Sequence, residues 1–154
     1  AENSFTFVGF PPSRSKARTS WLVALSNEPR PLILFESPHR IRATLQSILD
    51  IFGDRPISVC REITKAHECL VNGPISVVLK KLSEPRGEYT IVISPPNENQ
   101  EPYTNINNTK VCSLFGYLTK QGEFSRRSAI RKVAHVYGLT SREVYSMIEK
   151  GKLF

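Results

Sequence analysis

The sequence predicts a layered α/β domain followed by a small helical module, and three observations support this division. Residues 1–94 alternate between short apolar runs and segments whose apolar residues recur at helical spacing. Residues 95–108 are mainly Pro, Asn, Glu and Gln and predict a linker, because they offer almost nothing to bury. Residues 109–154 carry apolar residues at helical spacing. Alternating strands and helices are typical of layered α/β folds.

The first half of the α/β region predicts strand, helix, strand and helix in that order. A strand over 5–8 is stopped by two prolines, and the next segment has apolar residues at a spacing of four. Residues 32–35 form a continuous apolar run, which is typical of a strand buried on both faces. Ser37 is predicted to cap the following helix, Pro38 to lie in its first turn and Gly53 to end it.

The second half of this region predicts a strand, a helix and a final strand. The third strand begins near residue 57 and runs into the charged segment 61–65. A polar connection then leads through residues 73–74 to a helix over 75–82, which has apolar residues on one face. The last strand is predicted over 89–93 and is closed by two prolines.

The module over 109–154 predicts three short helices with a helix-turn-helix connection. The first helix has its apolar residues over 111–118. Ser125 is predicted to cap the second helix and Gly138 to end it, and Ser141 to cap the third. The turn from Gly138 to Ser141 has the length of a helix-turn-helix connection.

Composition and charge narrow the class of protein. The chain is 40% apolar and 23% charged, which excludes wholesale disorder. A net charge of +7 and a pI near 9.5 suggest a polyanionic partner such as nucleic acid. The sequence has no apolar run of membrane-spanning length and no secretory signal pattern, so no membrane partner is predicted. Residues 1–94 hold 12 basic and 9 acidic residues, whereas 95–154 hold 9 and 5, so the smaller part has the higher charge density.

The cysteines and glycines exclude several kinds of site. Cys60, Cys69 and Cys112 are widely spaced and form no zinc pattern with the three histidines, so we predict a reduced, cytoplasmic protein without structural metal. The eight glycines include no Gly-x-Gly, so no Walker or dinucleotide phosphate loop is present.

Basic residues on the second helix of the module allow two interpretations. Arg127, Arg131 and His135 follow one another at a spacing of four, away from the apolar stripe. This face contacts phosphates in one interpretation. In the other it is an ordinary solvated helix face.

Charged and turn residues gather directly after the predicted buried strands, over 36–40, 61–65 and 87–88, with Glu68 nearby. Ligands of open α/β sheets gather outside strand ends, so these residues are candidates for a binding rim. In the alternative interpretation the same residues only form helix caps and ion pairs, with Glu36 and Arg40 as a local pair.

Four blocks together resemble one family. They are FTFVGFPP over 5–12, FESPHR over 35–40, REITKAHE over 61–68 and Gly87-Glu88. In this order and with these gaps they are similar to the ribosomal small-subunit RNA methyltransferase I family of the tetrapyrrole-methylase superfamily. The second and third blocks mark its RNA-modifying branch. Residues 110–150 are similar to the short helical module that ends many members.

The resemblance implies a mixed sheet flanked by helices and transfer of a methyl group from S-adenosylmethionine to a cytidine ribose 2′-oxygen of 16S rRNA. Members have two α/β domains with the cofactor in the cleft between them, and they are usually dimers. A homodimer acting on the small ribosomal subunit or 16S rRNA is therefore implied. Because the resemblance covers only the second domain and the tail, we expect a C-terminal fragment that is inactive without the first domain.

The resemblance also implies residue roles. Gly87 suits a pocket wall, since a residue without Cβ lets a ligand approach the backbone. The implied cofactor-binding residues are Glu36, Ser37, Arg61, Gly87 and Glu88. The implied catalytic bases are Glu62 and Lys65. The implied RNA-binding residues are Arg14, Lys16, Arg18, Arg40, Arg126, Arg127, Arg131 and Lys132.

Two other functions stay open at this point. One is a basic module that binds RNA or mediates dimerisation without catalysis. The other is a tetrapyrrole methylase of the same superfamily, against which the basic charge and the helical module argue. A cofactor domain encoded upstream in frame would favour the methyltransferase over the non-catalytic module.

Overall fold

The computed structural model describes residues 4–82, 86–96, 108–120, 122 and 124–151. The chain divides into two compact units, Ala1–Asn97 and Glu98–Phe154. Of the predicted linker 95–108, residues 97–107 lie outside the described residues, and Asn108 already begins a helix. The first unit contains β1 (Thr6–Gly9), α1 (Ser15–Leu25), β2 (Leu32–Glu36), α2 (Ile41–Phe52), β3 (Pro56–Arg61), β4 (Cys69–Pro74), α3 (Ile75–Lys81) and β5 (Tyr89–Ile93).

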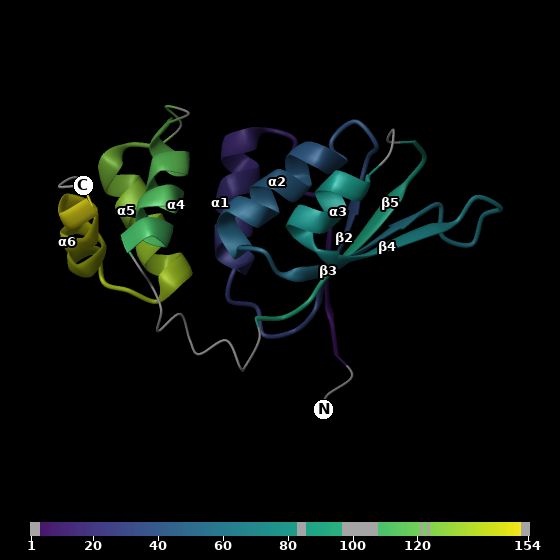
Figure 1. Ribbon diagram of the computed structural model, residues 1–154, viewed down its shortest axis with the longest axis horizontal. Coiled ribbons are helices and arrows are strands. Elements are labelled where there is room, and N and C mark those ends of the chain that lie inside the picture. Colours follow the sequence, from purple (N-terminus) through teal and green to yellow (C-terminus); the bar gives the residue numbers. More distant parts are fainter. Residues whose placement is uncertain (1–3, 83–85, 97–107, 121, 123, 152–154) are drawn as a thin grey trace. The chain divides into compact units, whose positions relative to one another are not determined.

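The strands of the first unit form one mixed sheet of order β1-β2-β5-β3-β4 (Figure 1). β1 and β2 are parallel, whereas β5 is antiparallel to both of its neighbours, β2 and β3. β2 and β3 therefore run in the same direction and end at the same edge of the sheet, where β5 begins. The mixed sheet expected from the family resemblance is confirmed.

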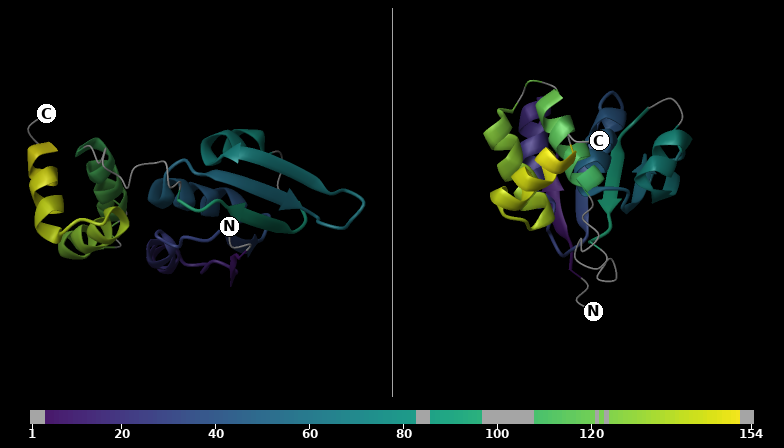
Figure 2. Two further views of the ribbon diagram at one scale, coloured as in Figure 1. Left: turned by 90° about the horizontal axis from the view of Figure 1, so that it is seen from below. Right: turned by 60° about the vertical axis from the view of Figure 1, so that its left-hand side comes forward.

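The helices of this unit pack on one face of the sheet. α2 lies between α1 and α3 and contacts both (Figures 1 and 2). Alternate residues of β2 and β5 are buried beneath these helices. The largest fully buried side chains of the unit include Leu22, Leu34, Ile41, Leu45, Ile48, Phe52, Ile75, Ile91 and Ile93.

The opposite face of the sheet carries exposed aromatic residues. Phe7 and Phe10 pack on Phe35, with ring centroids 5.1 and 5.6 Å away, and Phe35 itself is 37% exposed. The prediction that β2 is buried on both faces is therefore wrong. An apolar run alone does not distinguish a doubly buried strand from one that carries an aromatic cluster on its outer face.

The predicted polar connection between β3 and α3 is also wrong, because it contains the strand β4. β4 pairs antiparallel with β3 along its whole length, from Arg61 opposite Cys69 to Pro56 opposite Pro74. It is an edge strand whose residues are mostly exposed, so it lacks the alternation of a half-buried strand. Proline is tolerated at such an edge.

Helix boundaries confirm some predicted caps and correct others. The Ser125 hydroxyl accepts a hydrogen bond from the Ser128 N–H, and Gly53 and Gly138 end their helices as predicted. The Ser37 prediction is wrong: α2 begins at Ile41, and the Ser37 carbonyl accepts turn hydrogen bonds from the N–H groups of Arg40 and Ile41. A serine followed by proline has started a turn here rather than the helix itself.

The second unit is a bundle of α4 (Asn108–Lys120), α5 (Arg126–Tyr137) and α6 (Ser141–Gly151), in which each helix contacts the other two. Its core includes Val111, Leu114, Leu118, Val133 and Val144. The cap of α6 is Thr140 rather than the predicted Ser141. The Glu143 N–H donates to the Thr140 hydroxyl, and the Thr140 N–H donates to the Glu143 carboxylate 2.7 Å away, which is a capping box.

Candidate functional site

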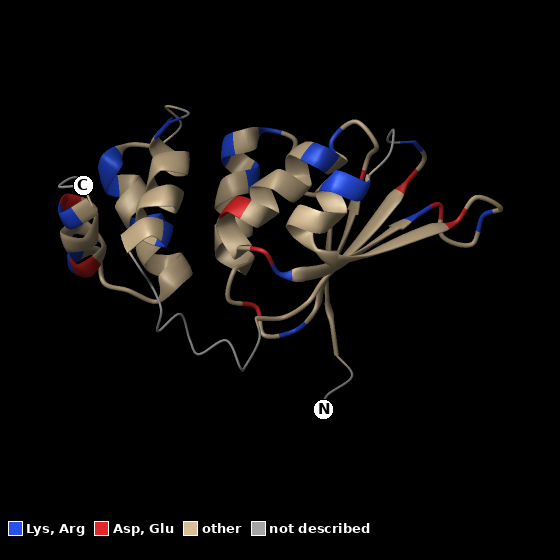
Figure 3. Ribbon diagram, viewed as in Figure 1, with Lys and Arg blue, Asp and Glu red and all other residues tan. Residues whose placement is uncertain are grey.

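The ends of β2 and β3 and the start of β5 bring the predicted rim residues to one edge of the sheet. Glu36 and Arg61 both lie opposite Tyr89 in the strand register. Charged residues gather at this end of β3, β4 and β5 (Figure 3). We call Arg61, Glu62, Lys65, Gly87 and Glu88 the strand-end rim.

Three charged side chains of the rim form one hydrogen-bonded cluster. The Lys65 ammonium lies 3.2 Å from Glu62 Oε1 and 3.1 Å from Glu88 Oε2. The Glu88 N–H donates to Glu62 Oε1 at 2.8 Å, and the Glu62 N–H donates to the Glu88 carbonyl at 3.0 Å. These bonds fasten the loop after β3 to the residue before β5.

Gly87 allows this cluster to form. Its φ is +71°, and a Cβ at this position would lie 2.3 Å from Glu62 Oε1. The sequence predicted that a missing Cβ serves close approach of a ligand. The structure shows that a Cβ at this position would collide with the Glu62 carboxylate, so the close approach of that carboxylate needs glycine here.

The loop after β3 has an unusual backbone. Glu62 and Thr64 adopt positive φ angles of 53° and 68°. The Thr64 N–H donates to the Glu68 carboxylate at 2.8 Å, and the Lys65 N–H donates to the Glu62 carbonyl at 2.9 Å. Non-glycine residues with left-handed backbone are uncommon and concentrate at functional sites. The loop after β3 is therefore a candidate for part of a functional site.

Electrostatics argue against the predicted catalytic bases. The Glu88 backbone N–H first, and the Lys65 ammonium second, lower the pKa of Glu62. The Glu88 and Glu62 carboxylates raise the pKa of Lys65. A general base works best with a pKa near neutrality, and both shifts lead away from it. The pKa shifts therefore do not support a general-base role for Glu62 or Lys65.

Glu36 is buried and fully engaged. One carboxylate oxygen accepts from the Ser37 N–H at 2.8 Å, and the other accepts from the Thr44 hydroxyl at 2.6 Å and lies 3.2 Å from the Arg40 guanidinium. The Arg40 guanidinium also donates to the Pro11 carbonyl. The local ion pair of Glu36 and Arg40, which the interpretation of these residues as caps and ion pairs expected, is therefore present. It connects the residues that follow β1 and β2 to the start of α2.

The basic residues predicted for RNA at the start of α1 and just before it divide into two groups. Arg14 and Lys16 are exposed. Arg18 is only 8% exposed, and its guanidinium donates to the Ser47 hydroxyl at 3.2 Å. The prediction that Arg18 contacts RNA is therefore corrected, because this side chain serves the packing of α1 on α2.

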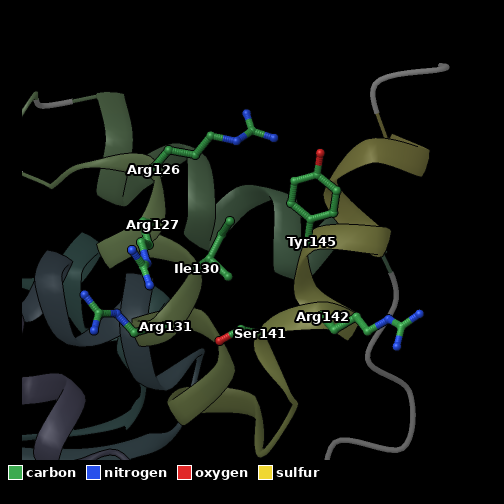
Figure 4. A pocket seen from close by; sticks show the side chains of 7 residues that line it. All are labelled: Arg126, Arg127, Ile130, Arg131, Ser141, Arg142 and Tyr145. Carbon is green, nitrogen blue, oxygen red and sulfur yellow. The ribbon is translucent and has the colours of Figure 1, made fainter.

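The second unit places four arginines around a pocket of about 550 Å³ between α5 and α6 (Figure 4). Lys132, in contrast, lies 4.8 Å from the centroid of the Phe124 ring and does not line the pocket. Arg142 and Tyr145 line it but were not among the sequence candidates. Their positions just after the helix-turn-helix connection are the signal that could have found them. The lining residues are Arg126, Arg127, Ile130, Arg131, Ser141, Arg142 and Tyr145.

The described part of the chain contains no candidate metal site and no candidate membrane-spanning helix. Its His, Cys, Asp and Glu side chains form no group of three or more that could hold a metal ion. No described helix is both long enough and apolar enough to cross a membrane.

The fold and the rim thus define an α/β unit with a charged sheet edge, joined in sequence to a basic helical unit. Comparison with curated proteins shows which family has similar sequences. The chain is 38% identical to ribosomal RNA small subunit methyltransferase I of Mycobacterium tuberculosis, over 94% of this chain and 49% of the relative. The enzyme of the same name from Bacillus subtilis is 33% identical over 92% and 49%. That from Thermotoga maritima is 40% identical over 60% and 42%.

These relatives confirm the resemblance to ribosomal RNA small subunit methyltransferase I. The chain spans about half the length of the curated relatives that it matches. No protein-family model matches it. Among solved structures, the methyltransferase CobJ aligns with a TM-score of 0.45 and 10% identity, over 60% of this chain and 41% of that one. At that level of likeness the fold assignment rests on the strand order itself.

Proposed function

We propose that this chain is part of an S-adenosylmethionine-dependent methyltransferase that acts in the cytoplasm on a cytidine ribose 2′-oxygen of 16S rRNA. The observation that carries the proposal is the Glu62–Lys65–Glu88 cluster at the sheet edge, within two of the blocks that resemble the family. Relatives named for small-subunit rRNA methylation, matching over nearly the whole chain, support it.

The rim residues fit the chemistry of this cofactor. S-adenosylmethionine carries its methyl group on a positively charged sulfur, which makes the methyl electrophilic. The Glu88 carboxylate is 86% exposed and can accept hydrogen bonds from a ribose or an amino group. Arg61 and Lys65 can donate to a carboxylate. The rim then forms one wall of a cleft that the rest of a longer protein completes.

The contribution of the rim to catalysis is positioning. Holding the attacking oxygen and the methyl group in line contributes on the order of 7–11 kcal/mol in good cases. The exposed Arg14 and Lys16 supply cations for RNA phosphates, which set orientation, whereas the charge of Arg40 is already paired with Glu36. We also propose that the longer protein is a homodimer, which light scattering on that protein tests.

The experiment uses the longer protein that contains this chain, with labelled S-adenosylmethionine and 16S rRNA or small ribosomal subunits. We expect label in the RNA. Lys65→Ala should lower kcat/KM about ten- to a hundredfold, because it removes a charged hydrogen-bond donor from the rim. Lys80→Ala is the matched control, since Lys80 is an exposed lysine on α3 outside the rim. Equal kcat/KM for the two variants would exclude Lys65 and the strand-end rim from the active site.

A further inference from the structure

The pocket of the helical unit has an apolar floor and charged sides. Ile130, which is only 9% exposed, lies between the two helices. Arg127 and Arg131 project from α5 on one side of it, and Arg142 projects from α6 on the other (Figure 4). Tyr145 stands at the pocket opposite Arg126 and is 51% exposed.

Most of the positive charge around this pocket is uncompensated within the described residues. Arg126 is paired with Glu149 and lies 5.8 Å from the centroid of the Tyr145 ring. Arg127, Arg131 and Arg142 are exposed and have no acidic partner among the residues that the structure describes.

The end of a helix adds to this charge, and the nearby acidic residue is not paired with it. The Glu143 carboxylate accepts from the Thr140 N–H and hydroxyl, both at 2.7 Å, and forms no ion pair with the pocket arginines in the described part of the chain. Ser141 lines the pocket and is the first residue of α6, so the positive end of the helix dipole adds to the same field. The pocket therefore favours an anionic occupant.

We propose that this pocket binds an unpaired nucleotide of single-stranded RNA, with its base stacked on Tyr145 and the flanking phosphates held by Arg127, Arg131 and Arg142. The choice of RNA as the polyanion rests on the proposed function. Phosphates are matched by guanidinium groups, which bind them in a bidentate way. A volume of about 550 Å³ is enough for one nucleotide.

Single-stranded RNA fits this site better than duplex. Stacking on a side chain requires a base that has left its own stack, and sequence-specific RNA recognition mostly targets such bases in loops and single strands. The major groove of an RNA duplex is too deep and narrow for side chains to read. A half-exposed tyrosine surrounded by arginines is typical of sites that bind single strands.

The test is equilibrium binding of the 154-residue chain to a labelled single-stranded RNA of about 12 nucleotides. We expect Tyr145→Ala to weaken binding about 5- to 150-fold and Tyr145→Phe to bind like the parent, because phenylalanine keeps the stacking plane. Arg127→Gln, Arg131→Gln and Arg142→Gln should each flatten the slope of log affinity against log salt by about 0.7. Lys150→Gln, an exposed charge on α6 outside the pocket, is the control and should leave affinity nearly unchanged.

Three results would overturn the proposal. They are unchanged binding by Tyr145→Ala, equal or tighter binding of a duplex of the same length, and displacement of the RNA by polyglutamate of the same charge. The helical signal in the far-UV circular dichroism spectrum of each variant is the control for folding. The assay needs neither cofactor nor methyl transfer, so its outcome is independent of whether the longer protein proves to be a methyltransferase.

Discussion

Gly87 and Glu62 are fitted to one another across the strand-end rim: the carboxylate of Glu62 occupies the space that any side chain at position 87 would need. The same carboxylate accepts the N–H of Glu88 and the ammonium of Lys65. One glycine therefore controls whether the loop after β3 can lie against the start of β5.

Replacing Gly87 with alanine should damage the rim in two ways. An L-residue at positive φ costs about 1–2 kcal/mol, and the new Cβ would also displace Glu62. Gly9→Ala is the control, because Gly9 has φ +69° with nothing within 4 Å of its Cβ position. We expect Gly87→Ala to lower the urea midpoint more than Gly9→Ala. Equal losses would show that the contact with Glu62 does not matter.

The Glu62 cluster should make stability depend on pH in the acid range. The pKa of Glu62 is lower in the folded chain than its ordinary value of 4.5. Its stabilising effect is therefore present above pH 4.5 and is lost as the pH falls through the folded value. The pKa of Lys65 is raised above 10.5, so Lys65 stays charged throughout this window.

Thermal melts of the parent chain and Glu62→Gln measure this effect. The difference in Tm between the two should be constant at neutral pH and shrink as the pH falls below 4.5. A difference that grows on acidification would contradict the direction of the Glu62 shift.

Glu36→Gln should destabilise the α/β unit by about 2 kcal/mol, because the amide cannot serve all the donors that the buried carboxylate now accepts. Thr44→Val removes only one of these hydrogen bonds and should cost about 1 kcal/mol. Urea unfolding of both variants gives the comparison. If Glu36→Gln proved harmless, the junction of β2 and α2 would not depend on this carboxylate.

The capping box of α6 predicts that substitutions of the adjacent residues Thr140 and Ser141 differ in their effect on stability. Thr140→Ala should cost the helical unit about 1 kcal/mol, since Thr140 and Glu143 satisfy each other's N–H groups. Ser141→Ala should change stability by no more than a few tenths of a kcal/mol, because Ser141 is an exposed residue of the helix itself. Circular dichroism melts distinguish the two. A larger loss for Ser141→Ala would reverse the cap assignment.

Much of the first unit could be predicted because its signals are local. The apolar spacing of α2 and the glycine after it determine a helix and its end within one segment. β4 could not be predicted in this way, since an edge strand is defined by its pairing with β3 and not by its own pattern.

The candidate site shows the same limit. The sequence indicated that Glu62, Lys65 and Glu88 share an edge, because strand ends meet there. It could not show that Gly87 accommodates the Glu62 carboxylate, or that Arg18 is buried on α2. Both facts depend on contacts between residues far apart in the chain.

The most direct test of the account is to map the methyl group. The longer protein is incubated with labelled S-adenosylmethionine and small ribosomal subunits, and the labelled nucleotide is isolated and analysed. We expect the label on a cytidine ribose of 16S rRNA, where a 2′-O-methyl group makes the adjoining phosphodiester resistant to alkali. A protein that binds the cofactor but labels neither subunits nor free rRNA would contradict the account.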